Sequence, residues 1–190
     1  MEYINYYESP LGKLLLSADD IGLTGVWFEE QKYFAQGLKE PYEEKELPVF
    51  EATKRWLTIY FSGKEPDFTV PFHFIGTDFQ KAVWEILRSI PYGKTMTYGE
   101  IAKQLALQKG ISHMSAQAVG GAVGHNKISI LVPCHRVVGT NGNLTGYAGG
   151  MDKKVKLLTL EGVDMENFFT NTPHKTPCLL YTSPSPRDST

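Results

Sequence analysis

The stretch Val132-Pro133-Cys134-His135-Arg136-Val137 places a cysteine between a proline and a basic pair. Pro133 fixes its own φ and favours an extended conformation at the residue before it. A largely apolar run, residues 128–132, leads into it, so the sequence predicts a buried strand that presents Cys134 at its end. A thiol becomes a strong nucleophile when it ionises, and neighbouring cations lower its pKa from about 8.5. Cys134 is therefore a candidate reactive thiol.

Two observations limit this interpretation. Unpaired cysteines are often buried and inert, so packing alone would also explain Cys134. Adjacent side chains on a strand point to opposite faces, so His135 would need a bridging water to reach the sulfur. The stretch by itself names no reaction.

Composition places the chain among globular proteins. Its residues are 42% apolar and 21% charged, and its length of 190 residues is enough for one domain or two small ones. No apolar run approaches the roughly 18 residues of a membrane span, and the N-terminus lacks a basic-then-apolar leader. Cys134 and Cys178 lie far apart with no clustered Cys/His spacing, so we expect no disulfide framework, metal or cofactor, and a cytoplasmic location.

The charge is unevenly distributed along the chain. Residues 76–163 carry ten Lys/Arg and five Asp/Glu, a net of +5, which leaves −7 for the remainder of a chain with net charge −2. Such asymmetry permits a basic face for a polyanion, although ordinary proteins also show it.

The first 70 residues predict an N-terminal lobe that combines a small sheet with helices. Short alternating runs near 3–7, 13–18 and 23–28 are separated by turn residues and predict an antiparallel meander. Helical spacing follows weakly at 31–39 and strongly at 48–61. Proline and glycine in 64–76 indicate a boundary between two lobes.

Residues 76–165 predict a largely helical second domain. Thr77 or Asp78 caps one helix, and Thr97 with Glu100 forms a capping box for the next. A helix of small residues at 115–124 follows after a polar turn, which is typical of a helix-turn-helix, although plain helix–helix packing is the alternative. A glycine-rich loop at 146–150 precedes a last helix at 151–162. The fold class is α/β (α+β).

The tail at 168–190 is rich in Thr, Ser and Pro without periodicity, and we expect it to be disordered and non-native. Cys178 is then an incidental thiol.

Several motifs, in order and at matching spacing, resemble the O6-alkylguanine-DNA alkyltransferases, the methylated-DNA–protein-cysteine methyltransferases. The resemblance covers about residues 1–165, and its N-terminal part resembles the bacterial branch. The motifs are Ser9-Pro10-Leu11-Gly12, Leu23-Thr24-Gly25-Val26, Thr97-Tyr98-Gly99-Glu100-Ile101-Ala102, Pro133-Cys134-His135-Arg136-Val137-Val138 and Gly146-Tyr147-Ala148-Gly149-Gly150. It implies a ribonuclease-H-like meander followed by a winged-helix-like domain that contains the reactive cysteine.

The resemblance also implies a reaction and its catalytic residues. An O6-alkylguanine is flipped out of double-stranded DNA, and its alkyl group moves irreversibly to Cys134, so each monomer acts once. His135 matches a water-mediated base, and Glu161 matches the carboxylate that orients it. Tyr98 matches a tyrosine whose hydroxyl donates toward the guanine. A soft thiolate suits displacement at a methyl carbon. Whether O4-methylthymine is also accepted stays open.

The DNA- and base-binding residues implied by the resemblance follow the same motifs. Asn126 matches an asparagine that braces the recognition helix, and Arg136 is expected to have a structural or charge role. The full set is Gln117, Ala118, Gly120, Gly121, Asn126, Arg136, Tyr147, Ala148 and Gly149.

One departure from the family concerns the second helix of the helix-turn-helix. Many members carry an arginine that fills the space left by the flipped base, where this chain has Gln117. Glutamine can bond the orphaned cytosine but lacks the charge and the stacking plane of arginine. Some members also bind zinc in the N-terminal lobe; this lobe has no cysteine, so we expect no metal there.

Three other functions remain open. A lesion-binding protein without transfer would not need Cys134. A helix-turn-helix regulator would leave Cys134, His135 and Glu161 unexplained. A cysteine hydrolase would turn over repeatedly, whereas a self-alkylating protein reacts once.

Overall fold

The computed structural model describes residues 1–168, and its N-terminal half is built on a four-stranded sheet in the order β3-β2-β1-β4. Strands β1 (Glu2–Ser9), β2 (Gly12–Ala18) and β3 (Leu23–Phe28) form the expected antiparallel meander. The short β4 (Tyr42–Glu44) pairs in parallel with β1. Its three exposed residues show no apolar alternation, so the sequence pattern does not reveal it.

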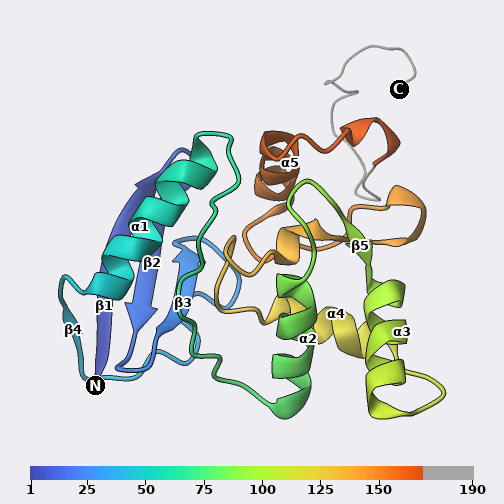
Figure 1. Ribbon diagram of the computed structural model, residues 1–190, viewed down its shortest axis with the longest axis horizontal. Coiled ribbons are helices and arrows are strands. Elements are labelled where there is room, and N and C mark those ends of the chain that lie inside the picture. The colour runs from blue at the N-terminus through green and yellow to red at the C-terminus, as the bar shows by residue number, and fades with distance from the viewer. Residues whose placement is uncertain (169–190) are drawn as a thin grey trace.

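Helix α1 (Pro48–Phe61) begins and ends where the sequence predicts, with proline in its first turn. Its buried stripe packs against β1 and β2 on one face of the sheet (Figure 1). The helix expected at 31–39 is wrong. Residues 31–38, here called the strap, form turns in which Tyr33 and Ala35 have positive φ. An α-helix of L-residues excludes that conformation.

The C-terminal half contains α2 (Asp78–Arg88), α3 (Tyr98–Lys109) and α4 (Ala116–Gly124). Thr77 and Thr97 close the capping boxes of α2 and α3, so both predicted starts are confirmed. Gly110 ends α3 in the left-handed conformation, and Ser115 caps α4. Helices α3 and α4 pack together as the two helices of a helix-turn-helix, and α2 packs against α4 (Figure 1).

The approach to Cys134 differs from the expected strand. Residues 128–132 are buried, but only Ile128 makes a β-bridge, to Val26 of β3. The chain then turns sharply, with Ile130 at φ 72, and a 3-10 turn, η1 (Cys134–Arg136), follows. The apolar run therefore predicts burial correctly and the strand incorrectly. A short apolar run indicates that a segment is buried but does not determine its backbone conformation.

The remaining elements complete the second half. Strand β6 (Val137–Val138) pairs in parallel with β5 (Met96–Thr97), and a 3-10 turn, η2 (Thr140–Gly142), follows. The last helix, α5 (Met151–Leu160), ends just before Glu161, and η3 (Met165–Asn167) comes after it. Apart from Phe168, the tail expected to be disordered lies outside the described residues.

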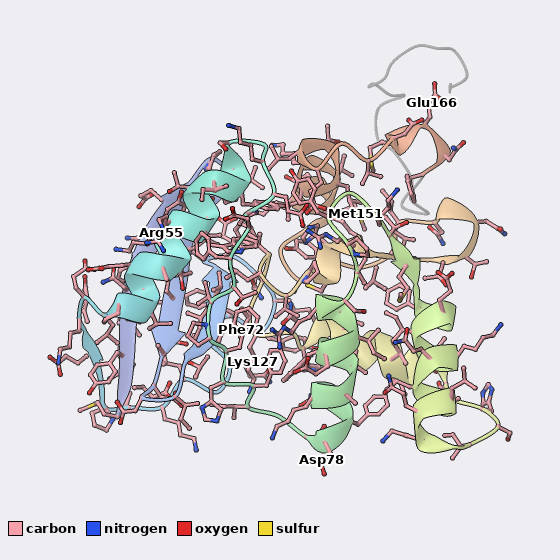
Figure 2. The ribbon with its side chains drawn as sticks, viewed as in Figure 1. Arg55, Phe72, Asp78, Lys127, Met151 and Glu166 are labelled. Atoms are coloured by element: carbon pink, nitrogen blue, oxygen red, sulfur yellow. The ribbon has the colours of Figure 1, made fainter. Side chains whose placement is uncertain are left out.

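The two halves share one hydrophobic core. The main buried cluster includes residues of the sheet, of α1 to α5 and of the segment before Cys134. Figure 2 shows side chains filling the space between the sheet and α2, where Phe72 and Lys127 are labelled. Backbone hydrogen bonds cross the same junction, from Val26 N to Lys127 O at 2.8 Å and from Ser129 N to Val26 O at 3.0 Å. The structure confirms the α/β (α+β) class, and a domain boundary within 64–76 stays a prediction.

Candidate active site

Cys134 lies at a cavity of about 340 Å³ between α4, the 145–150 loop and the strap. We call residues 145–150 the pocket loop. Among the residues predicted for the site, Tyr98, Gly120, Gly121, Cys134, Tyr147 and Ala148 line the cavity. Cys134 and the small-residue helix therefore face the same space, which could hold a flipped base.

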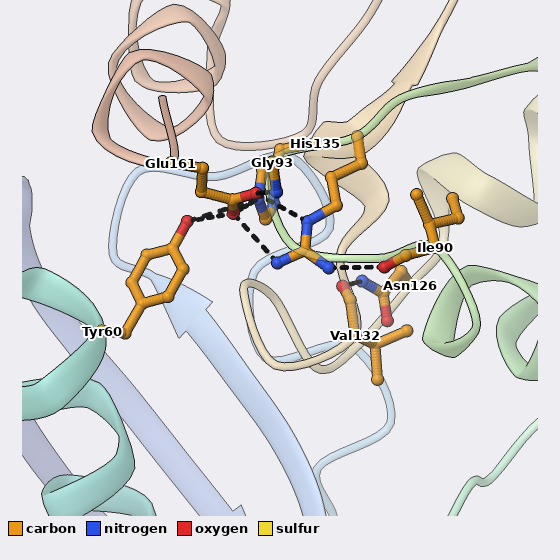
Figure 3. Close-up of polar contacts among 8 residues, drawn as sticks. Tyr60, Ile90, Gly93, Asn126, Val132, His135 and Glu161 are labelled. Carbon is orange, nitrogen blue, oxygen red and sulfur yellow. Dashed lines mark hydrogen bonds and ion pairs between the residues drawn. The ribbon is translucent and has the colours of Figure 1, made fainter. Parts of the chain in front are cut away.

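The Cys134 thiol is 5% exposed and is the only cysteine in the part of the chain that the structure describes. Burial raises the pKa of this thiol. The expectation that the adjacent basic pair lowers it is wrong, because His135 turns toward Glu161 (Figure 3). Arg136 also bonds that carboxylate. The resting sulfur is therefore a protonated thiol that needs a base to become nucleophilic.

Glu161 follows α5 and is buried at the centre of a cluster of hydrogen-bond donors, the Glu161 cluster. Its Oε1 accepts from Arg136 Nε at 2.8 Å and from Gly93 N at 3.0 Å. Its Oε2 accepts from His135 Nε2 at 2.6 Å, Tyr60 OH at 2.5 Å and Arg136 Nη2 at 3.1 Å. Burial alone would raise its pKa, but the bonds from His135 and Arg136 lower the pKa of Glu161 to about 2.

His135 is fully buried, and this burial lowers its pKa despite the opposing effect of Glu161. The imidazole is therefore neutral near pH 7. Since Glu161 is ionised, the hydrogen-bond network assigns the ring proton to Nε2, which donates to Oε2. Nδ1 is left with a free lone pair, and no described residue gives this buried atom a hydrogen-bond partner. It is the atom of His135 that can accept a proton.

Arg136, which the resemblance groups with the DNA-binding residues, lies inside the Glu161 cluster. Its guanidinium is buried, binds both oxygens of Glu161, and donates from Nη1 to Ile90 O at 2.6 Å. It is not among the residues lining the cavity. The geometry agrees with the expected structural or charge role and leaves Arg136 only 7% exposed, and its grouping with the DNA-binding residues stays a prediction.

Asn126 stabilises the turn that leads to Cys134. Its side-chain amide donates to Val132 O at 2.9 Å, and its oxygen accepts from Ile128 N at 3.1 Å. The residue lies just beyond α4, so it connects the end of that helix to the segment before the cysteine (Figure 3). This geometry matches the bracing role that the resemblance implies.

Two tyrosines and a glycine shape the cavity. Tyr98 OH donates to Thr145 O of the pocket loop at 3.2 Å, and burial raises the pKa of this phenol. Tyr147 lines the cavity from the pocket loop itself. At Gly149 a Cβ would lie 2.8 Å from the Tyr147 ring and 3.0 Å from Phe28, so only glycine fits.

The other DNA-binding candidates occupy the outer part of α4. Gln117 and Ala118 are exposed near its N-terminus and do not line the cavity, whereas Gly120 and Gly121 do. A Cβ at Gly121 would meet nothing within 4 Å. The small residues therefore leave the cavity open along this helix.

Lys154 of α5 is a site residue that sequence reasoning missed. It is fully buried, and its ammonium donates to Val137 O at 2.5 Å, Thr145 O at 3.1 Å and Gly146 O at 3.0 Å. Burial lowers the pKa of Lys154 to about 8. The side chain joins β6 to the pocket loop. In sequence it is one of two adjacent lysines in a helix, a pattern that normally indicates a solvated surface.

The N-terminal half also reaches the cavity, which no motif indicates. Lys32 and Tyr33 of the strap line it, and Lys32 N donates to Ala148 O at 2.9 Å. The Tyr33 ring stacks on His125 with centroids 4.0 Å apart, and His125 Nδ1 lies 3.1 Å from Gln36 Oε1. The strap is thereby held against both the end of α4 and the pocket loop.

Within the described residues, no group of three or more His, Cys, Asp or Glu side chains is arranged to hold a metal ion. No described helix is long and apolar enough to cross a membrane.

Two family models match the chain. Residues 3–74 match the 6-O-methylguanine DNA methyltransferase ribonuclease-like domain, and residues 78–163 match the DNA binding domain of the same enzyme. A relative from Methanosarcina acetivorans, "Methylated-DNA--protein-cysteine methyltransferase", is 46% identical over 84% of this chain and 98% of its own length. The chain belongs to this family.

Further relatives agree with this membership. A Haemophilus influenzae protein of the same name is 41% identical over 85% of this chain and 87% of its own length. The structure of Mycobacterium tuberculosis OGT in complex with DNA matches with a TM-score of 0.72 and 41% identity, covering 84% of this chain and 92% of the other. The methyltransferase family therefore covers both halves of the chain.

Proposed function

We propose that this methyltransferase repairs DNA by direct reversal, moving an alkyl group from O6 of guanine to its own Cys134. The observation that carries the proposal is the placement of a buried thiol in a base-sized cavity beside a neutral histidine with a free Nδ1. The transfer is irreversible, so each molecule acts once. A thiolate is the soft nucleophile that displacement at a methyl carbon needs.

The transfer divides into a proton transfer and a displacement. His135 Nδ1 takes the thiol proton through a bridging water, and the resulting imidazolium is stabilised by ionised Glu161. The Cys134 sulfur then attacks the alkyl carbon, an S–C bond forms, and the C–O6 bond breaks with its electron pair moving to guanine. Tyr98 lines the cavity, and its hydroxyl, which donates to Thr145 O in the structure, turns to donate toward the guanine as that negative charge develops.

DNA enters along the small-residue face of α4. The exposed Gln117 and Ala118 contact the duplex, and Gln117 bonds the cytosine left by the flipped guanine. Flipping costs a few kcal/mol, which contacts in the cavity offset. Tyr147 and Ala148 of the pocket loop form the opposite wall around the flipped base, and Gly149 leaves room for the Tyr147 ring.

We place the reaction in the cytoplasm and assign it to the monomer. An unpaired thiol that must stay reduced fits a reducing compartment, and one chain contains every proposed group. Cell fractionation and sedimentation with duplex DNA test these two points.

The decisive experiment uses duplex DNA with a single O6-guanine carrying an isotopically labelled methyl. The expected result is one labelled methyl per protein, located by peptide mass spectrometry on the fragment containing Cys134. Tight lesion binding without label transfer would instead indicate a non-transferring lesion-binding protein. Repeated turnover on small esters would indicate a hydrolase.

A further inference from the structure

Tyr60 is the only described residue of the N-terminal half whose side chain bonds to Glu161. It lies in the last turn of α1, is fully buried, and donates from its hydroxyl to Glu161 Oε2 at 2.5 Å (Figure 3). In sequence it belongs to the apolar stripe of α1, where an aromatic residue indicates only core packing. The hydroxyl gives it a second possible role.

The ring of Tyr60 is held on several sides, which fixes the direction of its hydroxyl. It stacks on Trp56 with centroids 5.4 Å apart and meets Phe61 and Tyr92 edge to face at 5.4 and 6.1 Å. Phenylalanine would keep all three aromatic contacts. The hydroxyl is therefore not needed for packing. Burying a hydroxyl without a hydrogen-bond partner costs free energy, and here Glu161 is the partner.

The same oxygen of Glu161 serves both Tyr60 and His135. Oε2 accepts from Tyr60 OH at 2.5 Å and from His135 Nε2 at 2.6 Å, and the two donors are 3.4 Å apart. A second strong hydrogen bond draws electron density from a carboxylate oxygen, so this oxygen stabilises a neighbouring imidazolium less. The Tyr60 hydroxyl consequently weakens His135 as a base while fixing the orientation of the carboxylate.

We propose that Tyr60 is a positioning residue for alkyl transfer: through Glu161 it sets the orientation and basicity of His135, so that α1 of the N-terminal half controls the activation of Cys134. The inference rests on the proposed function, in which His135 is the base. It gives the N-terminal half a direct part in the chemistry.

Other titratable groups surround this pair and stay unchanged in the test. Arg136 and Lys154 carry positive charge toward His135 from η1 and α5, and Cys134 precedes it in the chain. Tyr92 and Tyr147 face the same site from the segment after α2 and from the pocket loop. A shift produced by removing one hydroxyl can therefore be attributed to that hydroxyl.

The test compares Tyr60→Phe with wild type in single-turnover transfer from O6-methylguanine duplex between about pH 5 and pH 9. A protonated His135 cannot accept the Cys134 proton, so transfer falls on the acid side of the His135 pKa. Without the Tyr60 hydroxyl, Glu161 supports the imidazolium more strongly, and the acid limb moves to higher pH by about half a unit or more. Duplex affinity stays within about twofold of wild type.

Tyr7→Phe is the matched control. It also removes one tyrosine hydroxyl at α1, because Tyr7 OH lies 2.9 Å from Thr58 Oγ1 of that helix, but this hydroxyl is not one of the donors to Glu161. Its pH profile should superimpose on that of wild type. A Tyr60→Phe profile that also superimposes, or that moves to lower pH, overturns the proposal whatever happens to the melting temperature.

Two further measurements separate this proposal from the proposed function. An NMR titration of labelled His135 reports its pKa without any transfer, and Tyr60→Phe should raise it. Fluorinated tyrosine at position 60 keeps the packing and donates more strongly, so it should lower the same pKa. A His135 pKa that moves in neither variant refutes the role of Tyr60, whereas a wild-type protein that fails to transfer methyl refutes the function itself.

Discussion

The two halves of the chain contribute to the site by different routes. Residues 78–163 supply the thiol and the histidine from a motif that is recognisable in the sequence, and the carboxylate of Glu161 from a position that the family resemblance implies. The motifs within residues 3–74 contain no catalytic side chain, yet this half supplies Tyr60 to Glu161 and Lys32 and Tyr33 to the cavity. The comparison teaches that a half without a chemical motif can still determine how the chemistry proceeds, because packing brings its side chains to the reacting groups.

The largest expected effect tests the C-terminal half. Cys134→Ala removes the acceptor atom, so transfer should be abolished while affinity for lesion duplex stays within about twofold. Labelled-methyl transfer and equilibrium binding measure the two quantities. Cys178→Ala, which changes the other cysteine of the sequence, should transfer normally. Methyl accepted by the Cys134→Ala protein would remove the basis of the mechanism.

Glu161→Gln should have the next largest effect. It leaves Arg136 buried with a neutral partner, which should cost about 3–5 kcal/mol of unfolding free energy, and should slow transfer about 100-fold or more. Denaturant titrations and single-turnover rates measure both. Glu85→Gln changes an exposed pair with Arg88 and should shift stability by less than about 1 kcal/mol.

The loss of unfolding free energy in Glu161→Gln should also depend on pH. The folded pKa of Glu161, about 2, lies below its ordinary value, so its ionisation stabilises the fold above about pH 4.5. That contribution, about 3 kcal/mol, is lost as pH falls toward 2. The difference between wild type and Glu161→Gln should therefore shrink in acid. A difference that stays constant from pH 7 to about pH 3 would contradict the assignment.

Lys154→Met tests a residue of the C-terminal half that belongs to no recognisable motif. It keeps the aliphatic stem and leaves the carbonyls of Val137, Thr145 and Gly146 without their shared donor. The pocket loop should loosen, and transfer should slow about tenfold to 100-fold through misplacement of the base. Lys153→Met, at the adjacent position of α5, should leave the rate nearly unchanged. Equal rates in both variants would exclude a role for the buried ammonium.

The smallest expected effect tests the strap of the N-terminal half. Tyr33→Ala removes the stack on His125 at the cavity, and the rate of transfer from duplex DNA should fall about threefold to tenfold. Phe34→Ala changes the next aromatic residue, which is exposed and does not line the cavity, and should behave as wild type. If both variants match wild type, the strap covers the cavity without contributing to transfer.

Much of the helical framework follows from short-range sequence signals. Thr97 and Glu100 determine where α3 begins, and Pro48 and the apolar stripe determine the extent of α1, because caps and helical periodicity act within one or two turns. The strap and β4 could not be predicted in this way. The strap requires positive φ at Tyr33 and Ala35, and β4 depends on pairing with a strand about forty residues earlier.

The sequence by itself determined the candidate nucleophile, the helix-turn-helix and the membership of Cys134, His135 and Glu161 in one site, since each rests on a local motif or on the resemblance that such motifs carry. Only the tertiary structure decided that Arg136 turns toward Glu161, that Lys154 is buried under the pocket loop, and that Tyr60 donates to the same carboxylate. The physical reason is that burial and hydrogen-bond partners are set by contacts between distant segments. An identical lysine or tyrosine would be a solvated charge or a core ring in another fold.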